Sequence, residues 1–259
     1  MRKEARDLRA YDFVLRGTAY HHRLTKEDNV KAKDMFVQAI GLDPHYAPAY
    51  AGLAWVLVHD FVQGWSADPK DSLSSALENA QKAVSLDDSL AKAHMVLGDV
   101  YCWTRRHEQA VVEGRRAIAL DPSYAEGHMA LAYYLVTSGQ AREAVEEAQK
   151  ALRLNPVHQN VIYYTVLAQS YYMTKQYEAA MAAAEQGFSR GPNTRGPMIW
   201  LTAACAQLGR VDDARHHAEE LLRLRPDFSL RRFAEFLPYR NKADLNHVID
   251  GLRKAGLPE

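Results

Sequence analysis

Residues 91–124 read AKAHMVLGDVYCWTRRHEQAVVEGRRAIALDPSY, and this stretch decides the fold. Apolar or small residues recur in it every three to four positions, as at Leu97 and Tyr101 and again around Ala110, which is the spacing of one helix face. Small residues on such a face let two helix backbones approach closely. Pro122 ends the pattern, because proline disfavours helical geometry in the residue before it. The stretch therefore predicts two packed helices joined by a short turn.

The same pattern recurs along the chain with a period near 34 residues. One alanine marks the second half of each copy, and the six are Ala32, Ala76, Ala110, Ala144, Ala180 and Ala214. Twelve residues after each alanine stands a proline in five copies and Asp88 in the second. A period of this length predicts a solenoid, in which each repeat packs only on its neighbours.

We therefore divide the chain into a lead-in, six repeats and a tail. The lead-in is 1–9, the repeats are 10–46, 47–90, 91–124, 125–158, 159–194 and 195–228, and the tail is 229–259. The tail predicts a short helix over 229–237 and a second over 243–254, which stops before Gly256 and Pro258. We expect the second tail helix to cover the apolar face of the last repeat. The alternative is a detachable helix that binds a partner.

The repeat resembles the tetratricopeptide repeat, whose signature is Leu-Gly or Leu-Ala, then Tyr, Ala, Ala and Pro. The matches are Leu97-Gly98, Tyr101, Ala110, Ala117 and Pro122 in one copy, and Leu167-Ala168, Tyr171, Ala180 and Pro192 in another. Gly187 and Leu221 replace the second small alanine in the last two copies, which affects local packing. The resemblance implies an all-α fold: a right-handed α-solenoid of about six helix-turn-helix repeats with a C-terminal capping helix.

Four strings outside this signature resemble a narrower bacterial family. They are AYDFVLRGTAY (10–20), LTKEDNVKAKDMFVQAI (24–40), GWSADP (64–69) and LPYRNKADLNHVIDGLRKAGLPE (237–259). They are similar to the repeat region that follows class III adenylate/guanylate cyclase domains, or winged-helix DNA-binding domains, in multidomain regulators. The resemblance implies a regulatory role in a bacterial signalling protein. These residues carry no cyclase motif, so we expect no cyclase activity from them.

Composition narrows the function classes. The 259 residues hold 32 Lys+Arg against 32 Asp+Glu, so the net charge is zero, and 47% are hydrophobic, which excludes disorder over the whole chain. Charge balance argues against a dedicated nucleic-acid binder. The most apolar stretch, 46–58, is shorter than the ~18–20 residues that cross a bilayer. Two cysteines, Cys102 and Cys205, fit a reducing compartment. We expect a cytoplasmic protein without nucleic-acid or membrane partners.

Motifs for catalysis or metal binding do not rise above background. The sequence has no glycine-rich phosphate loop, no Gly-x-Ser-x-Gly elbow and no paired-cysteine zinc motif. It has eleven histidines, but no two lie four apart on a helix, so no local chelating pair exists. We expect no catalytic residues, no metal and no cofactor, and therefore no enzyme.

In tetratricopeptide folds the first helices of successive repeats line a concave surface. By the family's register this surface uses positions 2, 5, 9, 12 and 13 of each repeat, and only Lys92, Asp99 and Glu126 among those thirty residues are charged. An apolar, aromatic stripe of this extent is typical of a partner surface. We call it the predicted groove. Its candidate binding residues are Tyr11, His22, Trp55, His59, Met95, Asp99, Trp103, Met129, Tyr133, Gln169, Tyr172 and Met173.

The sequence also predicts the kind of partner. Some family members capture a peptide carboxylate with Lys at position 5 and Asn at position 9, and no repeat here has either residue. We expect instead a protein or peptide with an apolar or helical segment. The alternative is homo-oligomerisation through the groove or through the ten-residue insertion within 58–75. That insertion predicts either an elongated helix pair with locally packed aromatics or a ridge that closes one end of the groove.

Overall fold

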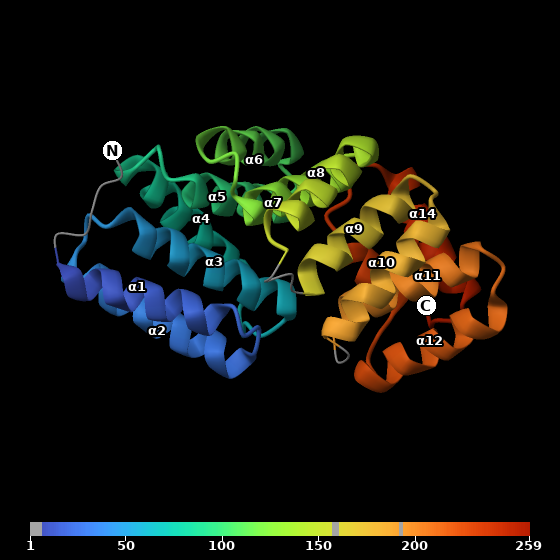
Figure 1. The fold of residues 1–259 in the computed structure, drawn as a ribbon. Coiled ribbons are helices and arrows are strands. Elements are labelled where there is room, and N and C mark those ends of the chain that lie inside the picture. Colours follow the sequence, from blue (N-terminus) through green and yellow to red (C-terminus); the bar gives the residue numbers. More distant parts are fainter. Residues whose placement is uncertain (1–6, 157–160, 192–193) are drawn as a thin grey trace. The chain divides into compact units, whose positions relative to one another are not determined.

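The computed structural model describes residues 7–156, 161–191 and 194–259, and in these residues the regular structure is helical, with no strand (Figure 1). The all-α solenoid is thereby confirmed. Lead-in residues 1–6, the boundary residues 157–160 and Pro192, predicted to close the fifth repeat, lie outside the described residues. The chain divides into two compact units, Met1–Pro122 and Ser123–Glu259.

The first unit contains three helix-turn-helix pairs. They are α1 (Leu8–His21) with α2 (Lys26–Leu42), α3 (Ala47–Gln63) with α4 (Pro69–Leu86), and α5 (Ala91–Trp103) with α6 (His107–Leu120). The first helices α1, α3 and α5 are neighbours in that order. Asp68 caps α4 by accepting from the backbone N–H groups of Lys70 and Asp71, and Pro69 is the first helical residue. The insertion therefore forms a lengthened helix pair.

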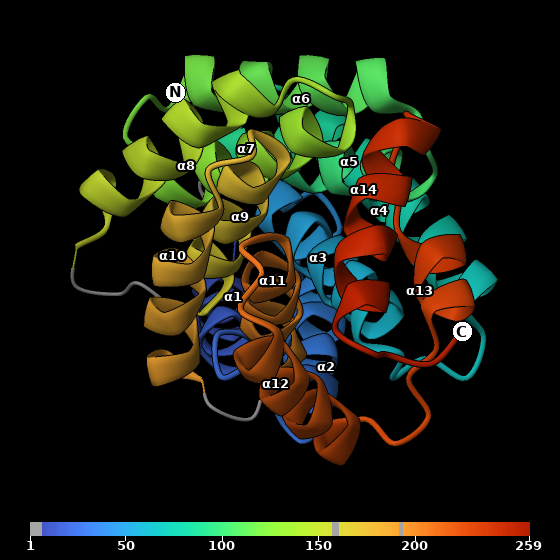
Figure 2. The ribbon, with the colours of Figure 1, turned by 90° about the vertical axis from the view of Figure 1, so that its right-hand side faces the viewer.

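The second unit contains three more pairs and the tail. The pairs are α7 (Ala125–Thr137) with α8 (Ala141–Leu154), α9 (Val161–Met173) with α10 (Tyr177–Arg190), and α11 (Arg195–Gln207) with α12 (Val211–Leu224). The tail forms α13 (Leu230–Phe236) and α14 (Lys242–Lys254). Figure 2 shows α14 beside α11 and α13 on the far side of α14, and α14 makes the tail's contact with α11.

Small residues hold the helix pairs together. All six alanines that reveal the repeat are at most 1% exposed. A very close approach occurs at Gly52 of α3, where an added Cβ would lie 2.2 Å from Cε1 of Phe36 on α2. Phe36 is itself fully buried. A side chain larger than hydrogen at position 52 has no room, so the spacing of these two helices depends on this glycine.

The turn inside most repeats contains one residue in the left-handed backbone region. Gly139 and Gly209 take it with φ of 92° and 73°, whereas Leu24, Arg105 and Lys175 take it with φ of 56°, 62° and 61°. Glycine adopts this conformation without penalty, and an L-residue pays roughly 1–2 kcal/mol for it. Helix packing on both sides of the turn offsets this cost and fixes the direction of each second helix.

We predict that Gly52→Ala lowers the free energy of unfolding by about 1–3 kcal/mol, because the new methyl group must displace the buried Phe36 ring. The matched control is Gly41→Ala in α2, where the described residues place no atom within 4 Å of the added Cβ. That control should be neutral or stabilising by up to ~1 kcal/mol. Urea denaturation measures both, and equal midpoints for the two variants would contradict the packing account.

Candidate binding surface

The predicted groove residues all lie on the first helices of their repeats or at their ends. In the first unit they are Tyr11 and His22 of the α1 region, Trp55 and His59 of α3, and Met95, Asp99 and Trp103 of α5. In the second unit they are Met129 and Tyr133 of α7 and Gln169, Tyr172 and Met173 of α9. The two sets are in different compact units, and their surroundings differ.

In the first unit, most of the predicted residues reach the surface. Tyr11 is 48% exposed and His22 is exposed, while Trp55 and His59 are half-buried. Met95 is 1% exposed and belongs to the core. Asp99 and Trp103 are half-buried, and the Trp103 ring meets the edge of Phe61 from the lengthened part of α3 at 5.7 Å. Trp103 therefore helps to anchor the insertion, while Trp55 and His59 are partly accessible to solvent.

A hydrogen-bonded chain of polar side chains lies beneath this surface. Nδ2 of Asn29 donates to the carbonyl of Val56 at 3.2 Å and to the carboxylate of Asp60 at 2.7 Å. Its Oδ1 therefore faces Nδ1 of His21, at 3.0 Å. Nε2 of His21 in turn lies 2.6 Å from Nδ1 of His59. Three helices of the first unit, α1, α2 and α3, meet in this chain.

The chain of contacts assigns the proton on each neutral imidazole. Because Asn29 uses its N–H groups on Val56 and Asp60, its oxygen must accept from Nδ1 of His21. Nε2 of neutral His21 is then an acceptor, and Nδ1 of His59 must donate to it. The remaining nitrogen of His59, Nε2, carries a lone pair.

Aromatic rings and a cation surround the histidine pair. The His21 ring lies 4.0 Å from the Trp55 ring, and Nζ of Lys92 on α5 lies 4.1 Å from the Trp55 centroid. Burial and the nearby His59 and Lys92 charges hold the pKa of His21 well below its ordinary value. Burial, with the charge of His22, lowers the pKa of His59 to about 4. Both rings are therefore neutral at physiological pH.

In the second unit, the tail lies on the predicted groove. The hydroxyl of Tyr172 donates to the carbonyl of His247 at 2.9 Å, and the two rings stack at 4.8 Å. Nε2 of Gln169 donates to the hydroxyl of Tyr239 at 2.9 Å. Gln169 and Tyr172 are both buried, so the chain's own tail occupies these two predicted binding residues.

The tail reaches further along the second unit than the last repeat. Its Lys254 donates to the side chain of Gln207 on α11 at 2.9 Å, and the backbone N–H of Arg240 donates to the carbonyl of Thr137 on α7 at 2.9 Å. Val248 and Leu252 of α14 are fully buried. The tail thus contacts the first helices of all three repeats in this unit, whereas the sequence predicted cover for the last repeat only.

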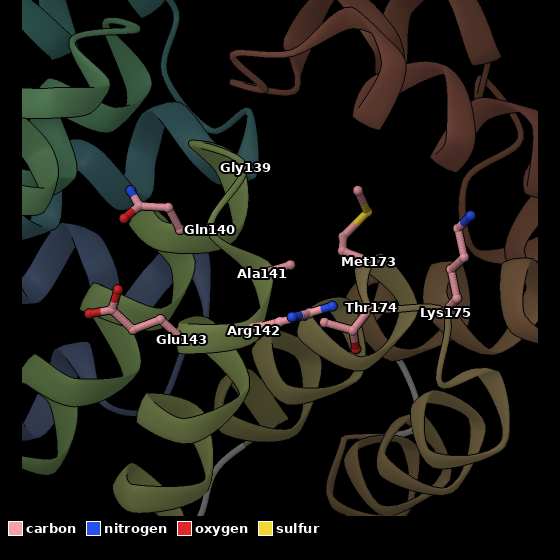
Figure 3. Close-up of a pocket in the computed structure, with 8 residues that line it drawn as sticks. All are labelled: Gly139, Gln140, Ala141, Arg142, Glu143, Met173, Thr174 and Lys175. Carbon is pink, nitrogen blue, oxygen red and sulfur yellow. The ribbon is translucent and has the colours of Figure 1, made fainter.

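Met173 lies at the rim of a shallow depression of about 530 Å³ in the second unit (Figure 3). The depression is formed by the turn from α7 into α8 and by the end of α9. Figure 3 shows Arg142 extending toward Thr174, while the side chains of Gln140 and Glu143 point away from Thr174. These side chains include no nucleophile paired with a general base, so the depression offers surface and charge rather than catalytic chemistry.

Two further buried histidines have structural partners. Nδ1 of His94 lies 2.6 Å from Oε2 of Glu113, and Nδ1 of His128 lies 2.5 Å from Oε2 of Glu147. Each pair joins the first and second helices of one repeat. Although burial lowers the pKa of His94, its bonds to Glu113 and to the carbonyl of Asp88 raise it overall. The described part of the chain holds no group of three or more His, Cys, Asp or Glu that could bind a metal ion.

Comparison with known proteins agrees with this architecture. A family model described as "Tetratricopeptide repeat" matches residues 129–192. The structure is similar to the solved structure titled "Crystal structure of APC/C hetero-tetramer Cut9-Hcn1", with a TM-score of 0.71 and 18% identity, over 96% of this chain and 43% of that one. Residues 129–192 therefore match the tetratricopeptide repeat, and the chain as a whole has a fold similar to that of the solved structure. A second match is YrrB, titled "a TPR protein with an unusual peptide-binding site", with a TM-score of 0.50, 20% identity and coverage of 77% and 97%.

One curated relative is similar in sequence. It is "Putative adenylate cyclase 3" of Rhizobium meliloti (strain 1021), 30% identical over 112 residues. The match covers 42% of this chain and 19% of the length of that relative. Within the described residues, no helix is both long and apolar enough to span a membrane.

The sequence pattern predicts a groove side for each first helix, but it does not predict the contacts that the side chains make there. His21 and Lys92 occupy groove positions, yet their convergence on Trp55 depends on how α1, α3 and α5 are spaced. Asn29 lies on a second helix, where the groove pattern gives no signal. The burial of Gln169 and Tyr172 depends on residues 70 or more positions away.

We predict that acid weakens the first unit through the histidine pair. The unfolded chain binds a proton at His59 with a pKa of about 6.5, whereas the folded chain does so at about 4. Between these values the unfolded state binds more protons, so the free energy of unfolding falls as pH falls, by up to about 1.4 kcal/mol per pH unit for this group. Urea denaturation at several pH values measures the slope.

The control for this prediction is His59→Gln, which keeps an N–H donor toward His21 but cannot titrate. Its unfolding free energy should decline less steeply over the same pH window. Parallel pH profiles for the variant and the unchanged chain would show that the histidine pair does not titrate as described.

Proposed function

We propose that the chain is a non-catalytic scaffold that binds a protein or peptide, and that it does so mainly through the groove residues of the first unit. The observation that carries this proposal is the location of the tail. In the second unit α14 lies on Tyr172 and Gln169, whereas in the first unit Tyr11, His22 and Trp55 remain accessible. Aromatic side chains supply large contact area at low entropic cost, which suits a partner surface.

The tail also indicates what such a surface accepts. α14 is an amphipathic helix that places buried Val248 and Leu252 on one side and exposed residues on the other. A helix of this kind docking on first helices supports a partner with an apolar or helical segment. The structurally similar YrrB has a title that names a peptide-binding site, which is consistent with the same class of function.

A regulatory setting follows from the sequence relative. Similarity to part of a protein named as an adenylate cyclase supports a role as the repeat region of a bacterial signalling protein. The cyclase activity of that name is not transferred, because the matched stretch covers 19% of the relative. Both cysteines are buried thiols outside any disulfide, which suits the reducing conditions of the cytoplasm. Tetratricopeptide proteins are in general scaffolds, which supports a function without catalysis.

Self-association through the groove or the insertion is the second candidate. The insertion is less favoured as a docking surface because its Phe61 packs on Trp103 within the same unit. We therefore assign the insertion a structural role, which is to lengthen the α3–α4 helix pair.

We predict that Trp55→Ala weakens partner capture by tenfold or more, since a central aromatic hot spot contributes about 2 kcal/mol or more. The measurement is affinity capture from a lysate of the source cell, quantified against the unchanged chain, with circular dichroism to check folding. Tyr11→Ala provides a second test at a more exposed site.

The matched control is Val112→Ala, which removes an exposed apolar side chain from α6, outside the groove. It should leave capture unchanged. A partner retained by both groove variants but lost by the control would overturn the assignment of the surface.

A further inference from the structure

The histidine pair of the first unit ends in a nitrogen that the chain itself does not use. Neutral His59 carries its N–H at Nδ1, which donates to His21, so its Nε2 is a hydrogen-bond acceptor. Among the described residues, none donates a hydrogen bond to this Nε2. His59 is half-buried, and its Nε2 is not sealed from solvent in the described structure. A partner that covers the groove here must supply a donor or leave the acceptor unpaired.

The proton on His59 is held in place by groups that can only accept hydrogen bonds. The carbonyl of Val56 and the carboxylate of Asp60 both accept from Nδ2 of Asn29, which fixes the direction of every bond that follows. Asn29 and His21 are each 2% exposed, so water does not compete for these bonds. If the proton of His59 moved to Nε2, two lone pairs would face each other at the 2.6 Å contact with His21.

A nearby cation restricts the donor to a neutral group. Nζ of Lys92 lies 4.1 Å from the centroid of the Trp55 ring, and the charge of Lys92 helps to lower the pKa of His21. The ring of Trp55 is in turn 6.0 Å from that of His59. A lysine or arginine of a partner would be repelled by Lys92 at this place. An acidic side chain would instead direct its own lone pairs at Nε2 of His59.

The donor must also come from a side chain. In a helical partner segment the backbone N–H groups bond to carbonyls of the same helix, so they cannot reach His59. The neutral side chains that donate hydrogen bonds are mainly those with a hydroxyl or a carboxamide group. Serine, threonine, asparagine and glutamine are therefore the partner residues that fit.

We propose that His59 determines the specificity of the groove by accepting a hydrogen bond from a hydroxyl or carboxamide side chain of the partner, beside an apolar partner side chain that covers Trp55. This preference rests on the proposed partner binding through the first unit and names the chemistry that the surface recognises. A partner without the donor leaves Nε2 of His59 covered and unpaired, which weakens binding roughly 10–100-fold.

The position of the proton is measured by nitrogen NMR of the full chain with isotope-labelled histidine at neutral pH. We expect His59 to be protonated at Nδ1 and unprotonated at Nε2. His216 on α12 is exposed and has no such chain of bonds, so it should show both neutral forms. A proton on Nε2 of His59, or an even mixture of its two forms, would overturn the proposal.

The partner chemistry is tested with peptides selected on the full chain from a phage-displayed library of helical peptides. Those whose binding is lost with Trp55→Ala bind at the groove and serve as probes. We expect these probes to share a serine, threonine, asparagine or glutamine. Replacing that residue by an apolar one of similar size, such as threonine by valine, should weaken binding to the unchanged chain roughly 10–100-fold.

His59→Asn tests whether the donor acts on His59. The asparagine amide can take the place of Nδ1 and donate to His21, but it is too short to reach the position of Nε2. Circular dichroism of this variant should match that of the unchanged chain. Probes with and without the donor should then bind the variant equally. His216→Asn is the matched control and should keep the full difference between the two probes.

The results separate this preference from the partner binding on which it rests. Groove probes that share no donor would overturn the preference, as would an equal loss of affinity for the unchanged chain and for His59→Asn. In both cases the groove would still bind a partner. A library that yields no probe dependent on Trp55 would instead contradict the proposed partner binding, and the preference would fall with it.

Discussion

The structure depends on the close approach of helices at small residues. Six buried alanines recur at the same place in the repeats, and Gly52 lets the Phe36 ring contact the α3 backbone directly. Close approach brings many atoms into van der Waals contact, and each such contact is small while their sum is large. Because the same spacing recurs, the first helices become neighbours in each unit, and their outward side chains form a surface that no single repeat could build.

The tail uses the same device as the repeats. Gly251 of α14 lies so close to α9 that an added Cβ would be 2.3 Å from the hydroxyl of Tyr172, and it would be 3.3 Å from Cβ of Ala203 on α11. A glycine of the tail and an alanine of the last repeat thus let α14 dock closely on the first helices. The second unit is in this way completed by the chain itself, whereas Tyr11 and His22 of the first unit remain exposed. A series of side-chain hydrogen bonds runs from Asp60 through Asn29 and His21 to His59. It lies beneath the first-helix surface of the first unit and ties α1 to α3.

The sequence could predict much of the fold because the repeat pattern is local and repeated. The periodic alanines located the helix pairs. It could not predict which groove residues are covered, since Tyr172 meets His247 across 75 positions and no local pattern encodes that contact. Gly251, between Val248 and Leu252 in the second tail helix, is a sequence signal for close docking of the tail. The histidine pair was hidden for the same reason, because His21 and His59 belong to different repeats.

Hydrogen exchange on the full chain measures directly whether α14 is a fixed part of the second unit and occupies its first-helix surface. We predict that amides in the middle of α14 exchange as slowly as those of α9 and α11. We also predict that Gly251→Leu speeds exchange in α14 and at the neighbouring ends of α9 and α11, while exchange in α1 to α6 stays unchanged. Amides of α14 that exchange at the rate of an unfolded peptide, while α9 and α11 stay protected, would contradict it.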